Sequence, residues 1–178
     1  MSTIVNRLLR ENVRNIKPYS SARSLVKAGS KTFLDANEHP VETPFNRYPD
    51  PNQRKLKQQV ARLKDVSETS VTFGNGSDEL LDLLIRAFCE PRRDNVVSIS
   101  PSYGMYKVLA NLNDVEFRTA LLNDDFSLNV ENVKARVDGN TKIIFLCSPN
   151  NPTGQLLSKE KIQNLLQNTD AMIVVDEA

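Results

Sequence analysis

Short apolar runs alternate with stretches of helical periodicity from residue 71 onward, and this alternation is the clearest pattern in the chain. Strands are predicted at 71–73, 95–99, 115–121, 142–147 and 171–175. Helices are predicted between them at about 78–89, 105–112, 130–137 and 158–168. Such alternation is typical of parallel strands joined by right-handed helical crossovers. The pattern therefore predicts an α/β fold with a doubly wound, mostly parallel sheet.

The residues before this region follow a different pattern. Apolar residues at helical spacing predict a helix over 3–16, which Pro18 ends. A second helix is predicted over 52–64, where Leu56 and Leu63 lie on one apolar face.

Between these helices lies a long irregular arm. Residues 20–50 show only one strand-like stretch, at 32–34, and are otherwise rich in polar and aromatic side chains. Long loops of this composition are typical of binding loops rather than linkers. We therefore expect an N-terminal helix and arm over 1–50 and a sheet domain over 51–178.

Composition narrows the class of protein. Of the 178 residues, 39% are hydrophobic and 25% are charged, close to the average of soluble globular domains. The net charge of +1 disfavours nucleic acid and membrane surfaces as partners. The isolated Cys89 and Cys147 lie in apolar segments and predict buried thiols rather than a disulfide or a metal site. With no recognisable signal peptide or membrane span, we expect a soluble cytoplasmic protein.

The loop from Cys147 to Gly154, with the sequence Cys-Ser-Pro-Asn-Asn-Pro-Thr-Gly, is the first candidate binding site. It follows the apolar run 143–146, and ligands of open α/β sheets bind at the carboxyl ends of the strands. Asn151 lies between two prolines that restrict the backbone, and its amide offers both a donor and an acceptor. The alternative is a plain turn, because asparagine, proline and glycine are also the usual turn residues.

The segment Gly74-Asn75-Gly76-Ser77-Asp78-Glu79 is a candidate anion site between a predicted strand and a predicted helix. Backbone amides at such a helix start can bind a phosphate, helped by the Ser77 hydroxyl. Asp78 would repel that phosphate if its carboxylate pointed toward it. The segment is neither a dinucleotide fingerprint nor a P-loop, because it lacks the third glycine and the Gly-Lys-Ser/Thr sequence. The alternative is a glycine turn in which Ser77 caps the helix.

An acidic residue, Asp176, follows the last predicted strand, and Tyr103 follows the strand 95–99. A buried carboxylate at this place can hold a protonated heterocyclic nitrogen, and the tyrosine ring can stack on a flat ligand. Two alternatives for Asp176 are a nucleotide hydrolase, which the absence of a Walker A lysine disfavours, and a solvated strand end.

Taken together, these features resemble the pyridoxal-phosphate-dependent aminotransferases of fold type I. The matching segments follow the order of that family and cover nearly the whole chain. They are Asn12-Val13-Arg14, Pro18-Tyr19, Leu34-Asp35-Ala36-Asn37-Glu38, Asn46-Arg47-Tyr48-Pro49, Gly76-Ser77-Asp78-Glu79, Ser102-Tyr103-Gly104-Met105-Tyr106, Ser148 to Gly154, and Val175-Asp176-Glu177-Ala178. The resemblance implies that 51–178 is the first, incomplete part of the cofactor-binding large domain.

The resemblance also implies roles for the candidate residues around the cofactor, pyridoxal 5'-phosphate. Gly76, Ser77 and Asp78 would cradle its phosphate group. Tyr103 would stack on its pyridine ring, and Asn151 would hydrogen-bond its phenolic oxygen.

Transamination is the activity that the resemblance implies. Asp176 would pair with the ring nitrogen and keep it protonated, so that the ring acts as an electron sink. The implied substrates are histidinol phosphate and 2-oxoglutarate, which would give imidazole-acetol phosphate and glutamate in histidine biosynthesis.

The arm carries the remaining residues that the resemblance assigns. Tyr48 would reach the cofactor phosphate of a neighbouring copy, which implies a homodimer. Tyr19, Asn37 and Glu38 would line the substrate side.

One residue of the family pattern is missing. The lysine that forms a Schiff base with the cofactor follows the Asp-Glu-Ala segment in the family, in a Ser-Lys context. Ser30-Lys31 and Ser158-Lys159 precede Asp176, so the role is not transferred to them. We therefore interpret the sequence as the first half of a longer enzyme and expect the 178-residue chain alone to be inactive. The alternatives are a non-catalytic fragment, or another aminotransferase or decarboxylase with the same cofactor.

Overall fold

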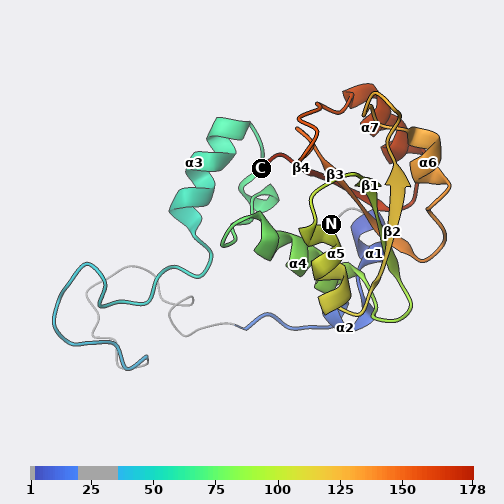
Figure 1. Ribbon diagram of the computed structural model, residues 1–178. Coiled ribbons are helices and arrows are strands. Elements are labelled where there is room, and N and C mark those ends of the chain that lie inside the picture. Colours follow the sequence, from blue (N-terminus) through green and yellow to red (C-terminus); the bar gives the residue numbers. More distant parts are fainter. Residues whose placement is uncertain (1–2, 20–35) are drawn as a thin grey trace. The chain divides into compact units, whose positions relative to one another are not determined.

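The computed structural model describes residues 3–19 and 36–178, which form two compact units (Figure 1). The sheet unit joins Met1–Ile16 to Gly74–Ala178, and the arm unit comprises Lys17–Phe73. These boundaries differ from the expected division near residue 50. That division separates an arm from a cofactor-binding domain by their function, and it stays a prediction. The strand-like stretch expected inside the arm lies outside the described residues.

A four-stranded parallel sheet forms the centre of the sheet unit. Its strands are β1 (Asn95–Ser100), β2 (Glu116–Leu121), β3 (Thr141–Cys147) and β4 (Met172–Asp176). Their spatial order is β2-β1-β3-β4, and each neighbouring pair is parallel. Nearly all of β3 is buried, because this continuous apolar run has a strand on each side and helices over both faces. The predicted parallel sheet is confirmed.

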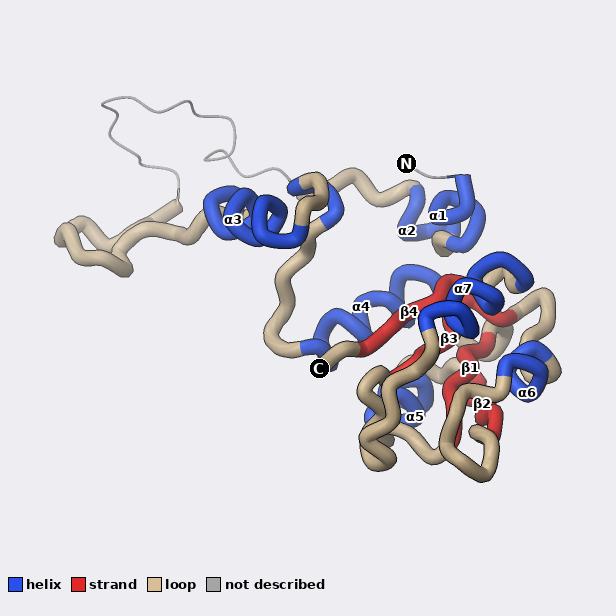
Figure 2. The backbone as a smooth tube through the Cα atoms, turned by 90° about the horizontal axis from the view of Figure 1, so that it is seen from above, coloured by secondary structure: helices blue, strands red, loops and turns tan. Residues whose placement is uncertain are grey.

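Helices cover both faces of this sheet (Figure 2). They are α4 (Ser77–Phe88), α5 (Met105–Leu112), α6 (Val130–Lys134) and α7 (Lys159–Asn168). Ile143 and Phe145 of β3 share a core with α4 and α5, whereas Ile144 and Leu146 share a core with α6 and α7. Successive residues of a strand point to opposite faces, so the apolar run supplies both cores. The predicted doubly wound arrangement is confirmed.

The N-terminal apolar segment forms two short helices instead of the single helix expected over 3–16. These helices, α1 (Thr3–Leu8) and α2 (Glu11–Arg14), are separated by Arg10, whose φ of −57° and ψ of 143° are not helical. The Arg10 amide donates a hydrogen bond of 3.0 Å to the carbonyl of Ala87 at the end of α4. A tertiary contact therefore replaces the helical hydrogen bond at this residue, which periodicity alone does not show.

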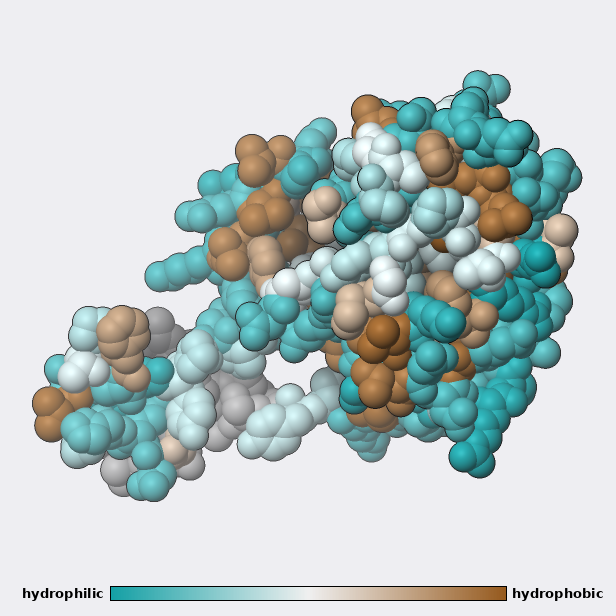
Figure 3. Space-filling view, viewed as in Figure 1, coloured by the Kyte–Doolittle hydropathy of each residue, from teal (hydrophilic) through white to brown (hydrophobic). Residues whose placement is uncertain are grey.

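In the arm unit, α3 (Arg54–Lys64) lies where the amphipathic helix was expected, and a 3-10 turn, η2 (Glu68–Ser70), follows it. Leu56 and Leu63 of α3 are 47% and 81% exposed. Figure 3 shows hydrophobic side chains gathered over this helix. Its apolar face is therefore largely open to solvent in the described structure.

The strand expected at 71–73 is not formed. Val71 has an extended backbone, with φ −112° and ψ 128°, but these residues pair with no strand among the described residues. A strand depends on a neighbour that exchanges backbone hydrogen bonds with it, and local apolar character does not supply one. Among the described residues, no helix is both long and apolar enough to span a membrane.

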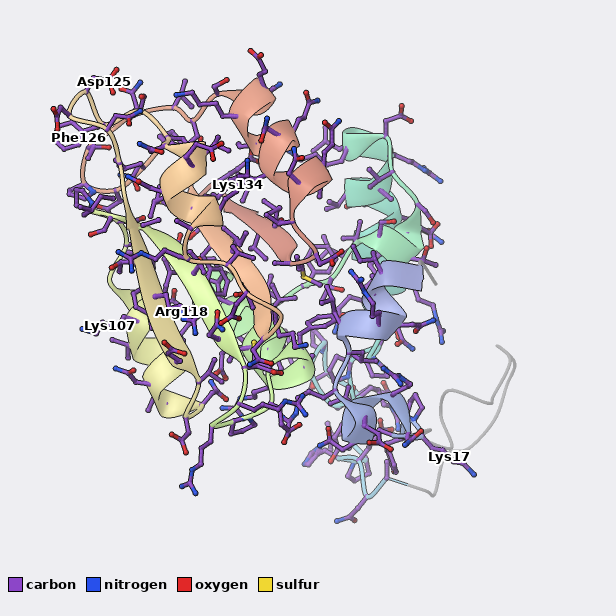
Figure 4. The ribbon with its side chains drawn as sticks, turned by 90° about the vertical axis from the view of Figure 1, so that its right-hand side faces the viewer. Lys17, Lys107, Arg118, Asp125, Phe126 and Lys134 are labelled. Carbon is purple, nitrogen blue, oxygen red and sulfur yellow. The ribbon has the colours of Figure 1, made fainter. Side chains whose placement is uncertain are left out.

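A cluster of ion pairs joins the amino ends of three strands. Arg118, on the edge strand β2 (Figure 4), lies 2.9 Å from Glu116 and 2.7 Å from Asp138. Asp138 also accepts a hydrogen bond of 2.9 Å from the side-chain amide of Asn95. The guanidinium of Arg118, followed by the amide of Asn95, holds the pKa of the Asp138 carboxyl well below its ordinary value. The cluster therefore stabilises the ionised form of Asp138 in the folded protein.

Asp138→Asn is expected to lower the melting temperature at neutral pH and to flatten its decrease toward acid pH. Because the pKa is lowered by folding, the carboxylate stabilises the protein above the ordinary aspartate value of about 3.9. This stabilisation is lost progressively as the pH falls below that value. Thermal unfolding from pH 7 to pH 3 measures the effect, with Asp124→Asn as an exposed control. If the difference in melting temperature between Asp138→Asn and the unchanged protein stays constant down to pH 3, the expectation is wrong.

Candidate functional site

Several predicted site residues meet at the carboxyl edge of the sheet. Asp176 ends β4 and is the register partner of Cys147 at the end of β3. The Ser148 amide donates a hydrogen bond of 2.9 Å to the Asp176 carbonyl, which continues this pairing into the loop after β3. The loop after β1, beyond Ser100, lies on the other side of β3. Parallel strands place the loops that follow β1, β3 and β4 at one edge.

Asp176 is the buried charge of this edge. Only 7% of the residue is exposed. Its Oδ2 accepts a hydrogen bond of 2.8 Å from the hydroxyl of Tyr106, and its Oδ1 accepts one of 3.1 Å from the amide of Ala178. Both donors are neutral, so they orient the carboxylate without cancelling its charge. A carboxylate in this state favours a cationic group beside it.

Tyr106, for which no role was predicted, is the main partner of Asp176. It is fully buried on α5, and its ring stacks on that of Phe145 with centroids 5.0 Å apart and planes at 7°. Burial, followed by the hydrogen bond to Asp176, raises the pKa of Tyr106 far above its ordinary value. Tyr106 follows Tyr103, a predicted site residue, by three residues, and this short spacing was the available signal, although Tyr103 itself lies before α5.

Tyr103 connects this edge to the start of α4. Its ring meets that of Tyr106 edge-on, with centroids 5.5 Å apart. Its hydroxyl lies 3.3 Å from both carboxylate oxygens of Asp78. Burial and the charge of Asp78 raise the pKa of Tyr103. The Asp78 carboxylate is therefore directed toward Tyr103, and it acts as an acceptor for a hydroxyl group.

The amino end of α4 has the geometry of an anion site. The residue before the helix is Gly76, with φ +82°, and a Cβ added there would meet no atom within 4 Å. A positive φ of this kind favours glycine. Ser77 is the first helical residue rather than the cap, and the cap residue Gly76 has no side chain to accept a hydrogen bond. The Glu79 carboxylate accepts a hydrogen bond from the Asn75 amide just before the helix. The first amides of the helix thus offer partial positive charge to a ligand.

The loop after β3 is held by Asn150 rather than by its neighbour Asn151. Asn150 is 1% exposed, and its Nδ2 donates hydrogen bonds of 3.0 Å to Pro101 O and 2.9 Å to Thr153 Oγ1. Its Oδ1 accepts one of 2.9 Å from Ser102. Asn151 is exposed, and its backbone amide lies 3.5 Å from the Cys147 sulfur. Asn150 therefore joins two loops, while the Asn151 side chain remains open to solvent.

The other predicted residues belong to the arm unit, so their roles stay predictions. Tyr19 and Tyr48 are 93% and 68% exposed, and Asn37 has a φ of +48°. The Glu38 carboxylate accepts hydrogen bonds of 3.0 Å from Arg47 and 2.8 Å from the Tyr48 amide. Within the arm unit, Glu38 thus stabilises the loop that carries Tyr48.

The sheet unit has surface hollows of about 320, 660, 570 and 410 Å³, and none of these four is lined by the predicted site residues.

Cys89 and Cys147 are both buried with free thiols, and burial raises the pKa of Cys89 to about 12. Within the described ranges, no group of three or more His, Cys, Asp or Glu side chains could hold a metal ion.

The fold is that of an α/β protein with a parallel sheet, and the carboxyl edge of such a sheet is where ligands of this fold class bind. Residues 15–178 match the model of the family Aminotransferase class I and II. The chain belongs to this family.

The relatives found are consistent with that assignment. The chain is 55% identical over 171 residues to histidinol-phosphate aminotransferase of Parabacteroides distasonis, covering 96% of this chain and 50% of the relative. It is 52% identical over 177 residues to the enzyme of the same name from Flavobacterium johnsoniae, covering 98% of this chain and 51% of the relative. The chain thus spans about half the length of these curated relatives.

A solved structure with a similar fold is histidinol-phosphate aminotransferase from Sinorhizobium meliloti in complex with pyridoxal-5'-phosphate. Its TM-score is 0.66 at 26% sequence identity, and the match covers 74% of this chain and 36% of that one. The shared fold agrees with the sequence resemblance to fold type I enzymes.

Proposed function

We propose that the sheet unit is the cofactor-binding part of an aminotransferase that uses pyridoxal 5'-phosphate. The observation that carries the proposal is Asp176, a buried carboxylate that Tyr106 and the Ala178 amide orient without neutralising. A pyridinium nitrogen is a cationic partner for such a group. Similarity to enzymes named histidinol-phosphate aminotransferase supports histidinol phosphate and 2-oxoglutarate as substrates. The products would be imidazole-acetol phosphate and glutamate.

The residues of the sheet unit bind and orient the cofactor in this proposal. Gly76, Ser77 and Asp78 cradle the phosphate through their backbone amides, and the Asp78 carboxylate accepts a hydrogen bond from the hydroxyl of Tyr103. The Tyr103 ring stacks on the pyridine, while the exposed Asn151 amide hydrogen-bonds its phenolic oxygen. When bound, pyridoxal phosphate withdraws electrons from the substrate carbon that loses a proton.

Asp176 completes this arrangement by keeping a proton on the ring nitrogen. A positive charge next to a buried carboxylate is strongly favoured where water is excluded, because screening is weak there. The chain therefore contributes to the reaction by binding, orientation and the placement of one charge.

The arm unit supplies the remaining contacts in this proposal. Tyr48 contributes to the cofactor phosphate of the neighbouring copy in a homodimer, and the exposure of its side chain is compatible with that role. Tyr19, Asn37 and Glu38 line the substrate side. The proposed location is the cytoplasm, as for a biosynthetic enzyme of small metabolites.

The lysine that binds the cofactor is not assigned to any residue of this chain. Lys159 is exposed in the first turn of α7, and its neighbour Ser158 caps that helix. The 178-residue polypeptide alone is therefore expected to form no glutamate. Borohydride treatment with pyridoxal phosphate should fix the cofactor to no specific lysine, as mass spectrometry would show. Stoichiometric labelling of one lysine contradicts this expectation.

The proposed activity is tested on the polypeptide encoded by the complete reading frame. Histidinol phosphate, 2-oxoglutarate and pyridoxal phosphate should together yield glutamate, and Asp176→Ala should reduce its formation by about two orders of magnitude or more. Release of carbon dioxide from a phosphorylated amino acid, without glutamate, favours the alternative decarboxylase. If neither product forms, the proposed function is wrong.

A further inference from the structure

Tyr106 carries a hydroxyl group into a buried, largely aromatic environment. The residue has no exposed surface, and Phe145 and Tyr103 contact its ring. A buried hydroxyl without a partner destabilises the folded state, so tyrosine is found at such a place only when its hydroxyl is hydrogen-bonded. The partner here is Asp176 Oδ2 at 2.8 Å.

This hydrogen bond determines the direction of the Asp176 carboxylate. The Tyr106 hydroxyl donates to Oδ2 and the Ala178 amide donates to Oδ1, so rotation of the carboxylate would break both hydrogen bonds. The Tyr106 ring is in turn clamped by its stacking on Phe145. The hydroxyl is therefore a rigid donor, and it stays neutral because burial raises its pKa far above the ordinary value.

The same ring also supports the stacking residue. Tyr103 meets Tyr106 edge-on at 5.5 Å, and its hydroxyl is directed to Asp78 at the start of α4. One buried side chain thus contacts both the carboxylate and the aromatic ring proposed to face the cofactor.

We infer that Tyr106 is a positioning residue: through its hydroxyl it holds the Asp176 carboxylate in the orientation that pairs with the cofactor ring nitrogen. The inference rests on the proposed function. Tyr106 does not touch the cofactor, and its effect on binding passes through Asp176. Removing the hydroxyl alone should therefore weaken binding only while the carboxylate is present.

A double-mutant cycle on the polypeptide encoded by the complete reading frame tests this. Pyridoxal phosphate is titrated into the unchanged chain, Tyr106→Phe, Asp176→Asn and the double variant, and binding is followed by absorbance. Tyr106→Phe should weaken binding by about tenfold, the order expected for one hydrogen bond to a charged group. Asp176→Asn should weaken it further, and the double variant should equal Asp176→Asn. A merely structural role of Tyr106 would instead make the two effects multiply.

Ser98→Ala is the matched control. Ser98 is fully buried, and its hydroxyl donates a hydrogen bond of 3.1 Å to the Phe145 carbonyl without contacting Asp176. This variant should bind the cofactor as the unchanged chain does. If the losses of affinity caused by the two substitutions multiply in the double variant, or if Tyr106→Phe binds the cofactor as tightly as the unchanged chain, the inference about Tyr106 is wrong and the proposed function stands. No saturable binding by the unchanged chain, or none lost in Asp176→Asn, overturns the proposed function and the inference with it.

A measurement without cofactor keeps the inference testable if Tyr106→Phe does not fold. Proton NMR of the unchanged chain should show a slowly exchanging Tyr106 hydroxyl proton with a nuclear Overhauser effect to the Asp176 β-protons. Asp176→Ala should abolish this signal. A rapidly exchanging hydroxyl in the unchanged chain contradicts the bond on which the inference depends.

Discussion

Phe145→Ala should lower the free energy of unfolding by about 3–5 kcal/mol, the range for phenylalanine truncation in a core. Phe145 lies in the central strand with no exposed surface, and its ring stacks on Tyr106. The substitution removes the buried ring and leaves a cavity that strands on both sides prevent from closing. Urea unfolding followed by circular dichroism measures the loss, since the chain has no tryptophan for fluorescence.

Phe126→Ala is the matched control for this substitution. Phe126 lies in the loop after β2 (Figure 4) and is 47% exposed. Its truncation should change stability by no more than about 0.5–1 kcal/mol. Equal losses for the two variants would show that Phe145 does not lie in a packed core.

Asn150→Ala should destabilise the fold, whereas Asn151→Ala should not, although the residues are neighbours. Asn150→Ala removes three part-buried side-chain hydrogen bonds and leaves Pro101 O and Ser102 Oγ without this partner. We expect a loss of about 2–3 kcal/mol in the free energy of unfolding. Asn151→Ala should change stability by less than about 0.5 kcal/mol, because its side chain is exposed.

For cofactor binding, Asn151→Ala is expected to be the variant with a direct effect. Under the proposed function, Asn151→Ala loses a hydrogen bond to the cofactor and should weaken pyridoxal phosphate binding by about tenfold. The titration is made at a temperature where both variants remain folded. A stability loss in Asn151→Ala together with unchanged binding contradicts the assignment of Asn151 to the site.

The fold could be predicted where hydrophobic pattern and burial correspond directly. The run Ile143-Ile144-Phe145-Leu146 is continuous because β3 is buried on both faces, and this predicted a parallel sheet. The prediction failed at residues 71–73 and at Arg10. Residues 71–73 lack a neighbouring strand to pair with in the described part of the chain, and the Arg10 amide bonds to Ala87, 77 residues away in the chain. A local hydrophobic pattern contains no information about such distant partners.

The alternation of strands and helices, the candidate residues Gly76, Tyr103, Asn151 and Asp176, and the family resemblance could all be predicted from the sequence. These follow from local periodicity, turn chemistry and the order of motifs. The hydrogen bond between Tyr106 and Asp176, which are 70 residues apart in the chain, became evident only from the three-dimensional structure. The structure likewise decided that Asn150, rather than Asn151, joins two loops. A buried polar group needs a hydrogen-bond partner close to it in space, and only the fold determines which group is near enough.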